Sequence, residues 1–267
     1  MCELFAMSSR RPTVATITLE RFAARGGLDG RTIDGWGLAL YDGPEVRLYR
    51  EPEPARGSPW LQYVQGRRLP TQLLISHIRH ATRGSVRLAN TQPFAREIGG
   101  RMHCFAHNGR LEPLLQRDAP RPQRFHPVGD TDSELAACLL FDDVARLWER
   151  ATPPPLADRR QVVERFAAAM RPLGPANFLY ADGEYLFAHG HRRTQADGRI
   201  TPPGLWLLHR RCAVDHDQLP EAGLSLDAAP GPQEVTLVAS VPLTDEDWRP
   251  LGEGEWVVVA AGIPVDT

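Results

Sequence analysis

Cys2 follows Met1 directly, and its side chain is small enough for ordinary removal of that methionine. Removal leaves one residue that carries both a thiol and a free α-amine. The reference pKa of an α-amine is about 7.7–8.0, so the amine can take the thiol proton near neutral pH and later donate it to a leaving amine. The pair predicts nucleophilic attack on a carbonyl carbon by a mature chain that begins at Cys2. A cysteine at this position is, by itself, also compatible with no function.

The residues after an apolar run of strand length include a candidate ligand for a carboxylate. Residues 77–84 read His-Ile-Arg-His-Ala-Thr-Arg-Gly and continue the apolar run 73–77. Arg79 at such a strand end can grip a substrate carboxylate with its planar guanidinium group. A surface strand end with solvated arginines would give the same pattern.

A second strand end carries two candidate donors for an oxyanion. Residues 105–109 read Phe-Ala-His-Asn-Gly. The Asn108 side-chain amide and the Gly109 backbone N–H are close enough to bind one developing oxyanion, and glycine lets the backbone approach the reacting carbon. Asn-Gly is also the commonest hairpin turn, so a purely structural explanation stays open.

An acidic segment precedes the first long helical pattern. Residues 129–134 read Gly-Asp-Thr-Asp-Ser-Glu, in which Thr131 and Glu134 have the spacing of a capping box. Asp132 in the same turn is predicted to face a substrate ammonium group. A helix cap explains the segment except for this additional acid.

Two further patterns involve tryptophan and histidine. Residues 34–37 read Asp-Gly-Trp-Gly and open a strand, and core packing is the expected role of Trp36. His103 and His107 have a spacing that suggests a metal site. Four residues of strand at about 3.3 Å each, however, separate the two rings by roughly 13 Å, which is too far to share a metal. We therefore expect no metal and no cofactor.

The apolar periodicity predicts strands, then helices, then strands. Strands are expected at 3–7, 37–41, 46–49, 73–77, 102–106, 177–180, 185–188, 205–208, 235–239 and 256–260, and helices at 18–25, 134–148 and 161–170. Loops are expected at 113–127 and 215–232. This order is typical of an α+β fold in which antiparallel sheets pack against helices.

Composition narrows the classes of function. The chain has 267 residues and a formal net charge of −2, and its 31 basic residues are all arginine, which excludes a Schiff-base lysine, a phosphate-loop lysine and a Ser-Lys dyad. No run of like charges indicates nucleic acid or a membrane surface, so the expected partner is a small molecule. The four cysteines are widely spaced, and neither an export signal nor a membrane-length apolar run is present. We expect one cytoplasmic domain over residues 1–267.

Taken in chain order, these motifs resemble the class II glutamine amidotransferases, which are N-terminal-nucleophile (Ntn) hydrolases. The motifs are Cys2, Asp-Gly-Trp-Gly at 34–37, Arg-His-Ala-Thr-Arg-Gly at 79–84, His-Asn-Gly at 107–109 and Thr-Asp-Ser-Glu at 131–134. The likeness is greatest to the stand-alone bacterial YafJ-type proteins and their relative in ergothioneine synthesis. The resemblance implies a four-layer αββα sandwich of two mainly antiparallel sheets flanked by helices.

The resemblance also implies roles for individual residues. Cys2 matches the nucleophile, Arg79 the ligand of the glutamine α-carboxylate and Asp132 the ligand of its α-amino group. Asn108 and Gly109 match the oxyanion hole. The remaining residues on the predicted substrate side are His80, Thr82 and His107.

The implied activity is hydrolysis of glutamine or another γ-glutamyl amide through a γ-glutamyl thioester on Cys2. One alternative is an ammonia-donating subunit for a separate synthase, and another is a catalytically silent glutamine-binding sensor. Sugar-phosphate members of the family usually carry Trp and His where this chain has His80 and Arg83, so glucosamine 6-phosphate synthesis is not expected. A sensor needs no nucleophile, and the complete motif set therefore favours an enzyme.

Overall fold

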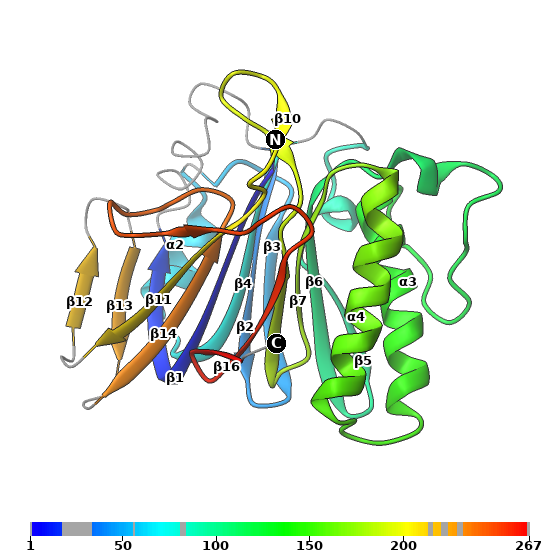
Figure 1. The fold of residues 1–267 in the computed structure, drawn as a ribbon. Coiled ribbons are helices and arrows are strands. Elements are labelled where there is room, and N and C mark those ends of the chain that lie inside the picture. Colours follow the sequence, from blue (N-terminus) through cyan, green and yellow to red (C-terminus); the bar gives the residue numbers. More distant parts are fainter. Residues whose placement is uncertain are drawn as a thin grey trace.

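Two antiparallel sheets lie face to face, and helices cover their outer faces (Figure 1). The computed structural model describes residues 2–17, 34–55, 57–80, 84–212, 216–219, 224–228 and 232–265. Every strand pairing within these residues is antiparallel. The N-terminus lies at one end of the two sheets, beside the β9–β10 hairpin.

Among the described residues, the larger sheet has nine strands in the order β15-β11-β14-β1-β4-β2-β3, and β13 pairs both β1 and β12. The N-terminal strand β1 therefore lies inside the sheet and has partners on both sides. The bounds are β1 Glu3–Ile17, β2 Gly35–Asp42, β3 Glu45–Glu51, β4 Thr71–Arg79, β11 Trp206–Cys212, β12 His216–Leu219, β13 Leu224–Ala228, β14 Gln233–Ala239 and β15 Arg249–Pro250.

The second sheet has six strands in the described part of the chain, in the order β17-β16-β8-β7-β6-β5. Its bounds are β5 Phe94–Ile98, β6 Arg101–Gly109, β7 Ala176–Ala181, β8 Tyr185–His189, β16 Trp256–Ala260 and β17 Ile263–Val265. A separate short hairpin pairs β9 (Arg193–Thr194) with β10 (Ile200–Thr201).

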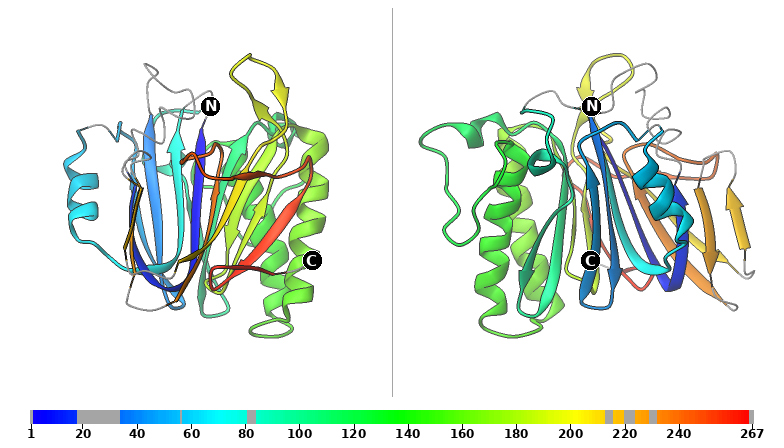
Figure 2. Two further views of the ribbon diagram at one scale, coloured as in Figure 1. Left: turned by 60° about the vertical axis from the view of Figure 1, so that its left-hand side comes forward. Right: turned by 180° about the vertical axis from the view of Figure 1, so that it is seen from behind.

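Helices complete the layers on both outer faces (Figure 2). The six-stranded sheet is covered by α3 (Asp132–Trp148) and α4 (Leu156–Met170), and the nine-stranded sheet by α2 (Pro59–Gly66). Single 3-10 turns are η2 Leu88–Asn90, η3 Glu112–Leu115 and η4 Arg171–Leu173. Among the helices of the described residues, none is long and apolar enough to cross a membrane.

Strand β4 shows how the sequence fills the core on both faces of a sheet. Successive strand residues point to opposite faces, so a strand covered on both sides must be apolar at nearly every position. Leu73 and Ile75 face the core between the sheets, whereas Leu74 and Ile78 face the outer core under α2. The same alternation directs Arg79, at the end of β4, toward the space between the sheets.

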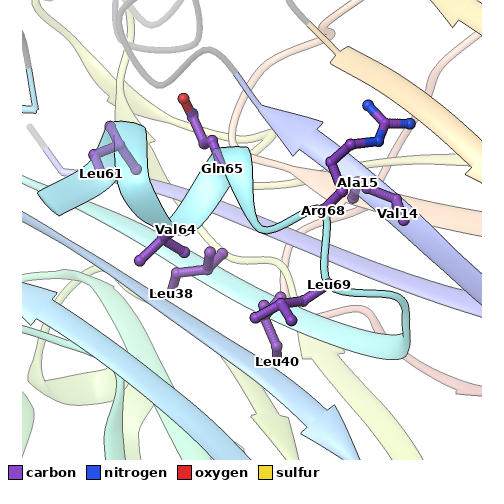
Figure 3. Close-up of a pocket in the computed structure, with 9 residues that line it drawn as sticks. All are labelled: Val14, Ala15, Leu38, Leu40, Leu61, Val64, Gln65, Arg68 and Leu69. Carbon is purple, nitrogen blue, oxygen red and sulfur yellow. The ribbon is translucent and has the colours of Figure 1, made fainter. Parts of the chain in front are cut away.

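Helix α2 leaves a small apolar cavity over the nine-stranded sheet (Figure 3). Ser58 caps the helix by accepting a hydrogen bond from the Leu61 N–H over 3.0 Å. Val64 lies next to Leu38 of β2 and Leu69 lies next to Leu40, and the cavity that they line together with Leu61 measures about 30 Å³. Its lining is almost entirely apolar, so packing of α2 is sufficient to explain it.

The expected α+β sandwich is confirmed, and most expected elements are found within two or three residues. Helix α3 matches the predicted helix 134–148, and α4 starts five residues before the predicted 161–170. Asp182 and Gly183 join β7 to β8, as the hairpin signal predicted. The predicted helix 18–25 lies outside the described residues.

The prediction of a loop over 215–232 is wrong in part. Residues 216–219 and 224–228 form β12 and β13, which pair with each other. The physical reason is the length of β1, because its second half, from Thr13 to Ile17, offers unpaired backbone groups that β13 satisfies. The proline-rich segment 113–127 has no strand or α-helix, as expected, apart from the end of η3.

Arg159 of α4 holds a buried ion pair between the helical layer and the six-stranded sheet. Its Nη1 lies 2.9 Å from Asp182 Oδ2 and 3.0 Å from Glu184 Oε2. The guanidinium also lies over the rings of Trp148 and Tyr185, at 5.2 and 5.0 Å from their centroids. Asp182 follows the end of β7, and the ion pair therefore lies one strand length from Ala176 at the start of that strand. Removal of the pair is expected to change stability alone.

We expect Arg159→Met to lower the free energy of unfolding by about 3–5 kcal/mol, because Asp182 then keeps a buried charge without its cation. Urea unfolding followed by circular dichroism measures this change. The matched control is Arg146→Met, which removes an exposed pair with Asp143 and is expected to change the same quantity by less than about 1 kcal/mol. Equal effects of the two substitutions would contradict the assignment of Arg159.

Candidate active site

Cys2 lies directly before β1, and its thiol contacts the backbone at the end of β4. The His80 N–H points at Cys2 Sγ over 3.4 Å, and Sγ lies 3.5 Å from the His80 carbonyl oxygen. Burial raises the pKa of the Cys2 thiol, although the His80 N–H acts in the opposite direction. The resting group is therefore the thiol, and its attack on a carbonyl carbon requires a base.

The register between β1 and β4 brings Arg79 beside Cys2. Glu3 pairs with Ile78, so the residues that flank this pair, Cys2 and Arg79, are neighbours across the two strands. The Arg79 side chain is 4% exposed, and its Nη2 donates to the Gly84 carbonyl oxygen over 3.3 Å. A cation therefore lies close to the thiol in a site that solvent screens weakly.

Asn108 reaches Cys2 from the opposite sheet. Cys104 and Ala106 of β6 face the core between the sheets, and Asn108 continues that face. Its Nδ2 donates to the Cys2 carbonyl oxygen over 2.5 Å and lies 3.4 Å from Ser240 Oγ. One of the two amide hydrogens is therefore tightly engaged, and the other makes only a long contact.

Gly109 ends β6 at a point where two backbone segments approach closely. It pairs with Ala176 of β7, so Asn-Gly here continues a strand, and the hairpin-turn explanation is excluded. A Cβ atom at position 109 would lie 1.8 Å from the Pro175 carbonyl oxygen. The next residue, Arg110, donates its backbone N–H to that same carbonyl over 3.1 Å. Only glycine fits this position.

His107 is buried, and both of its ring nitrogens have protein partners. Nε2 lies 3.3 Å from the Pro175 carbonyl oxygen, and Nδ1 lies 2.9 Å from Ser133 Oγ. A carbonyl only accepts, so the neutral ring carries its proton on Nε2 and accepts the Ser133 hydroxyl at Nδ1. Burial lowers the pKa of His107, which keeps the ring neutral. These contacts join His107 of β6 to Pro175, which precedes β7, and to Ser133 of α3. They leave the ring poorly placed to serve as a base for Cys2.

Gln92 fixes the backbone of β6 next to Asn108. Its Oε1 accepts from the His107 N–H over 2.6 Å, and its Nε2 donates to the His107 carbonyl oxygen over 3.1 Å. The Asp-Gly-Trp-Gly motif permits this contact, because a Cβ atom at Gly37 would lie 1.9 Å from the Gln92 carbonyl oxygen. Trp36 is fully buried, as predicted. The motif therefore serves the site indirectly, through Gln92.

Asp132 is the first residue of α3, and its carboxylate accepts from the backbone. Oδ2 accepts from the Leu111 N–H over 2.6 Å, and Oδ1 accepts from the Ser133 N–H over 2.9 Å. Thr131 caps the helix through the Glu134 N–H, as its spacing predicted. Glu134 does not return the contact, since its carboxylate binds Gly129 N–H and Arg96. The cap thus accounts for Thr131 and leaves Asp132 as an additional anion.

A cavity of about 50 Å³ joins these groups. Cys2, Arg79 and Asp132 all line it, so a thiol, a cation and an anion meet in one space. The full lining is Cys2, Arg79, His80, Asn90, Gln92, His107, Gly109, Arg110, Thr131, Asp132 and Ser133.

Of the predicted site residues, only Thr82 lies outside the described residues. Asn108 is not among the residues that line the cavity, but its side chain donates to the carbonyl oxygen of Cys2, which does line it. His80 lines the cavity, and its Nδ1 lies 3.8 Å from Asp34 Oδ2. His103 and His107 do not share a site. The His103 ring contacts the Tyr180 hydroxyl at 2.7 Å and the Trp148 ring of α3, between the six-stranded sheet and the helices.

Sequence reasoning missed the residues that support the site from behind. These are Glu3, Gln92, Arg193 and Ser240. Glu3 carried a usable signal, since an acid inside an otherwise apolar buried strand is rare unless it is paired. Gln92, Arg193 and Ser240 carried none, because their partners are distant in the chain.

Comparison with known proteins identifies the class of protein. A family model of the class II glutamine amidotransferases matches residues 1–267, and the chain belongs to that family. It is 35% identical over 263 residues to YafJ of Escherichia coli K12, and the match covers 98% of each chain.

Solved structures agree with this assignment. A crystal structure of a predicted glutamine amidotransferase from Pseudomonas aeruginosa PA01 is 33% identical, covers 100% of both chains and superposes with a TM-score of 0.71. The glutamine phosphoribosylpyrophosphate amidotransferase of B. subtilis shares the fold, with 14% identity and a TM-score of 0.52 over 97% of this chain and 47% of that one.

Proposed function

We propose that the chain cleaves glutamine or another γ-glutamyl amide through a γ-glutamyl thioester on Cys2. The observation that carries this proposal is the meeting of Cys2, Arg79 and Asp132 around one cavity. An amino acid substrate presents a carboxylate, an ammonium group and, at its far end, an amide carbonyl. Arg79 suits the first, Asp132 the second and the Cys2 thiol the third.

The first half of the reaction forms the thioester. With Met1 removed, the α-amine of Cys2 takes the thiol proton, and Sγ attacks the amide carbon to form a C–S bond. The resulting α-ammonium then gives the proton to the leaving amine as the C–N bond breaks. In the second half, the amine takes a proton from water as the hydroxide attacks the thioester carbon. The α-ammonium returns that proton to the leaving thiolate, and the released γ-carboxylic acid loses its proton to solvent.

The developing oxyanion needs donors between the two sheets. Gly109 N–H and the more weakly engaged hydrogen of Asn108 Nδ2 are the proposed pair. Preorganised donors of this kind typically contribute about 10²–10³ to kcat each, because they lose little energy to reorganisation. Gln92 and His107 support this pair by fixing the β6 backbone.

The proposed substrate ligands predict separate defects. Arg79→Gln and Asp132→Asn are each expected to lower kcat/KM for glutamine by about two to three orders of magnitude, because each leaves one substrate charge without its partner. Steady-state kinetics on glutamine and on N-acetylglutamine measures this. Parent enzyme that cleaves N-acetylglutamine as well as glutamine would remove the proposed role of Asp132.

Incubation of the pure protein with a panel of γ-glutamyl amides, with release of each amine measured, tests the proposed function. Release that depends on Cys2 is the expected result. Saturable binding of glutamine without release of any amine would instead indicate a sensor. Release that appears only after a synthase is added would indicate an ammonia-donating subunit.

A further inference from the structure

Glu3, the residue that follows the proposed nucleophile, carries a fully buried carboxyl group. Its Oε1 lies 2.8 Å from Arg193 Nη2 of β9. Arg193 is 4% exposed and donates through Nη1 to the Ser240 carbonyl oxygen over 2.6 Å. Glu3 Oε2 is also buried, and within the described part of the chain it makes no hydrogen bond of normal geometry, although the nearby Ser240 side chain acts to lower the pKa of the carboxyl group. One oxygen is therefore anchored by Arg193, and the other keeps the capacity to accept.

The same unit reaches the proposed oxyanion donor. Ser240, whose carbonyl binds Arg193, accepts the Leu4 N–H at its hydroxyl over 2.9 Å. That hydroxyl lies 3.4 Å from Asn108 Nδ2. Glu3, Arg193 and Ser240 thus form one buried assembly that contacts the strand of Cys2 on one side and Asn108 on the other.

A buried carboxylate with an unused acceptor is costly unless a second positive charge compensates it. The thioester route supplies such a charge. When the α-amine of Cys2 takes the thiol proton, an ammonium ion forms one peptide unit from Glu3. Two charges at that separation in a weakly screened site interact strongly.

We propose that Glu3 is a positioning residue whose carboxylate, anchored by Arg193, faces the α-amine of Cys2 and stabilises the ammonium ion formed during turnover. The inference rests on the proposed function, in which that amine is the base. The proton moves from Sγ to the α-nitrogen and then to the leaving amine. The Glu3 carboxylate neither gains nor loses a proton in these steps.

Several charges set the conditions of the test. Among the described side chains, Arg79 of β4 and Arg193 of β9 are the cations that act on Cys2 or Glu3. Burial raises the pKa of Glu3 to about 7, and Arg193 opposes that rise. The pKa of the Cys2 thiol is raised by burial and, to a smaller extent, by Glu3. The carboxylate is therefore fully ionised only on the alkaline side of neutrality, where the plateau rate is to be read.

The test is Glu3→Gln in protein shown by intact mass to begin at Cys2. A carboxylate raises the pKa of a neighbouring amine, so its loss is expected to move the acidic limb of the kcat/KM profile downward by about one pH unit. The alkaline plateau of kcat is expected to fall about tenfold, because the ammonium ion loses its charge partner. KM is expected to stay within about twofold, since Glu3 does not line the cavity.

Asp182→Asn is the matched control. It removes a second buried Arg–carboxylate pair among the described residues, that of Arg159 with Asp182, whose distance is 2.9 Å against 2.8 Å for Glu3 and Arg193. It is expected to lower the melting temperature and to leave the acidic limb in place. If Glu3→Gln does not fold, Glu3→Gln combined with Arg193→Met removes both charges and is expected to shift the limb in the same direction by less.

A second readout separates this inference from the proposed function. The rate of Cys2 alkylation by iodoacetamide reports the thiol and its amine without any substrate, and Glu3→Gln is expected to move its midpoint to lower pH. An unmoved or upward midpoint overturns the role of Glu3, even if Cys2-dependent turnover stands. A fall in kcat while the acidic limb of the kcat/KM profile and the alkylation midpoint both stay in place also overturns it. A downward midpoint in a protein that cleaves no γ-glutamyl amide would keep Glu3 as the partner of the amine and remove the proposed function alone.

Discussion

Cys2→Ala is expected to lower kcat for a cleaved γ-glutamyl amide by about four orders of magnitude or more, because no other thiol contacts the cavity among the described residues. The substitution removes one half-buried sulfur atom at the start of a strand, so the fold is expected to persist. Amine release under saturating substrate measures the loss, and thermal unfolding checks the fold. Comparable turnover of variant and parent would exclude the thioester route.

Cys104→Ala is the control for this substitution. Cys104 is fully buried in the core between the sheets, where burial raises the pKa of its thiol to about 12. The variant is expected to keep kcat while losing about 1 kcal/mol or more of unfolding free energy, because a buried atom is replaced by a void. Loss of activity at this position without loss of stability would point to a second reactive thiol.

Retention of Met1 is expected to abolish turnover. A peptide bond to Met1 turns the α-amine of Cys2 into an amide nitrogen, which has no basicity near neutral pH. The thiol, whose pKa is already raised by burial, then has no built-in base. Intact mass of active protein is expected to show Met1 absent. A preparation with an uncleavable N-terminal tag is expected to be inactive until a protease exposes Cys2.

The control for Met1 is the same tagged protein with a protease site that leaves one additional residue before Cys2. Cleavage there changes the tag and still blocks the amine, so it is expected to restore nothing. Full activity of protein that keeps Met1 would mean that another group activates the thiol. His107 would not be that group without rearrangement, since its two ring nitrogens already contact Pro175 and Ser133.

The residues that lie at the ends of their strands could be placed from the sequence because each follows a clear periodic signal. Arg79 follows the apolar run of β4, and Asn108 and Gly109 follow that of β6. Asp132 follows a helix cap whose Thr131 contact is present. Antiparallel pairing of β1 with β4 then places Arg79 beside Cys2, and the face-to-face packing of the two sheets brings Asn108 to Cys2.

The supporting contacts could not be predicted, because they join segments with no sequence relation. Gln92 and His107 are 15 residues apart in the sequence, and Arg193 and Glu3 are 190 residues apart. The strands β12 and β13 were missed for a similar reason, since their pairing is dictated by the length of β1. Long-range partners of this kind are set by tertiary packing, which overrides local propensity.

The central claim is that Cys2 carries a γ-glutamyl group during turnover. Rapid acid quenching of the enzyme with saturating substrate, followed by peptide mass spectrometry, tests it directly. The N-terminal peptide is expected to gain the mass of one γ-glutamyl group on Cys2, and hydroxylamine is expected to remove it as the hydroxamate. Steady turnover with no such adduct on Cys2, or with the adduct on another residue, would contradict the thioester mechanism.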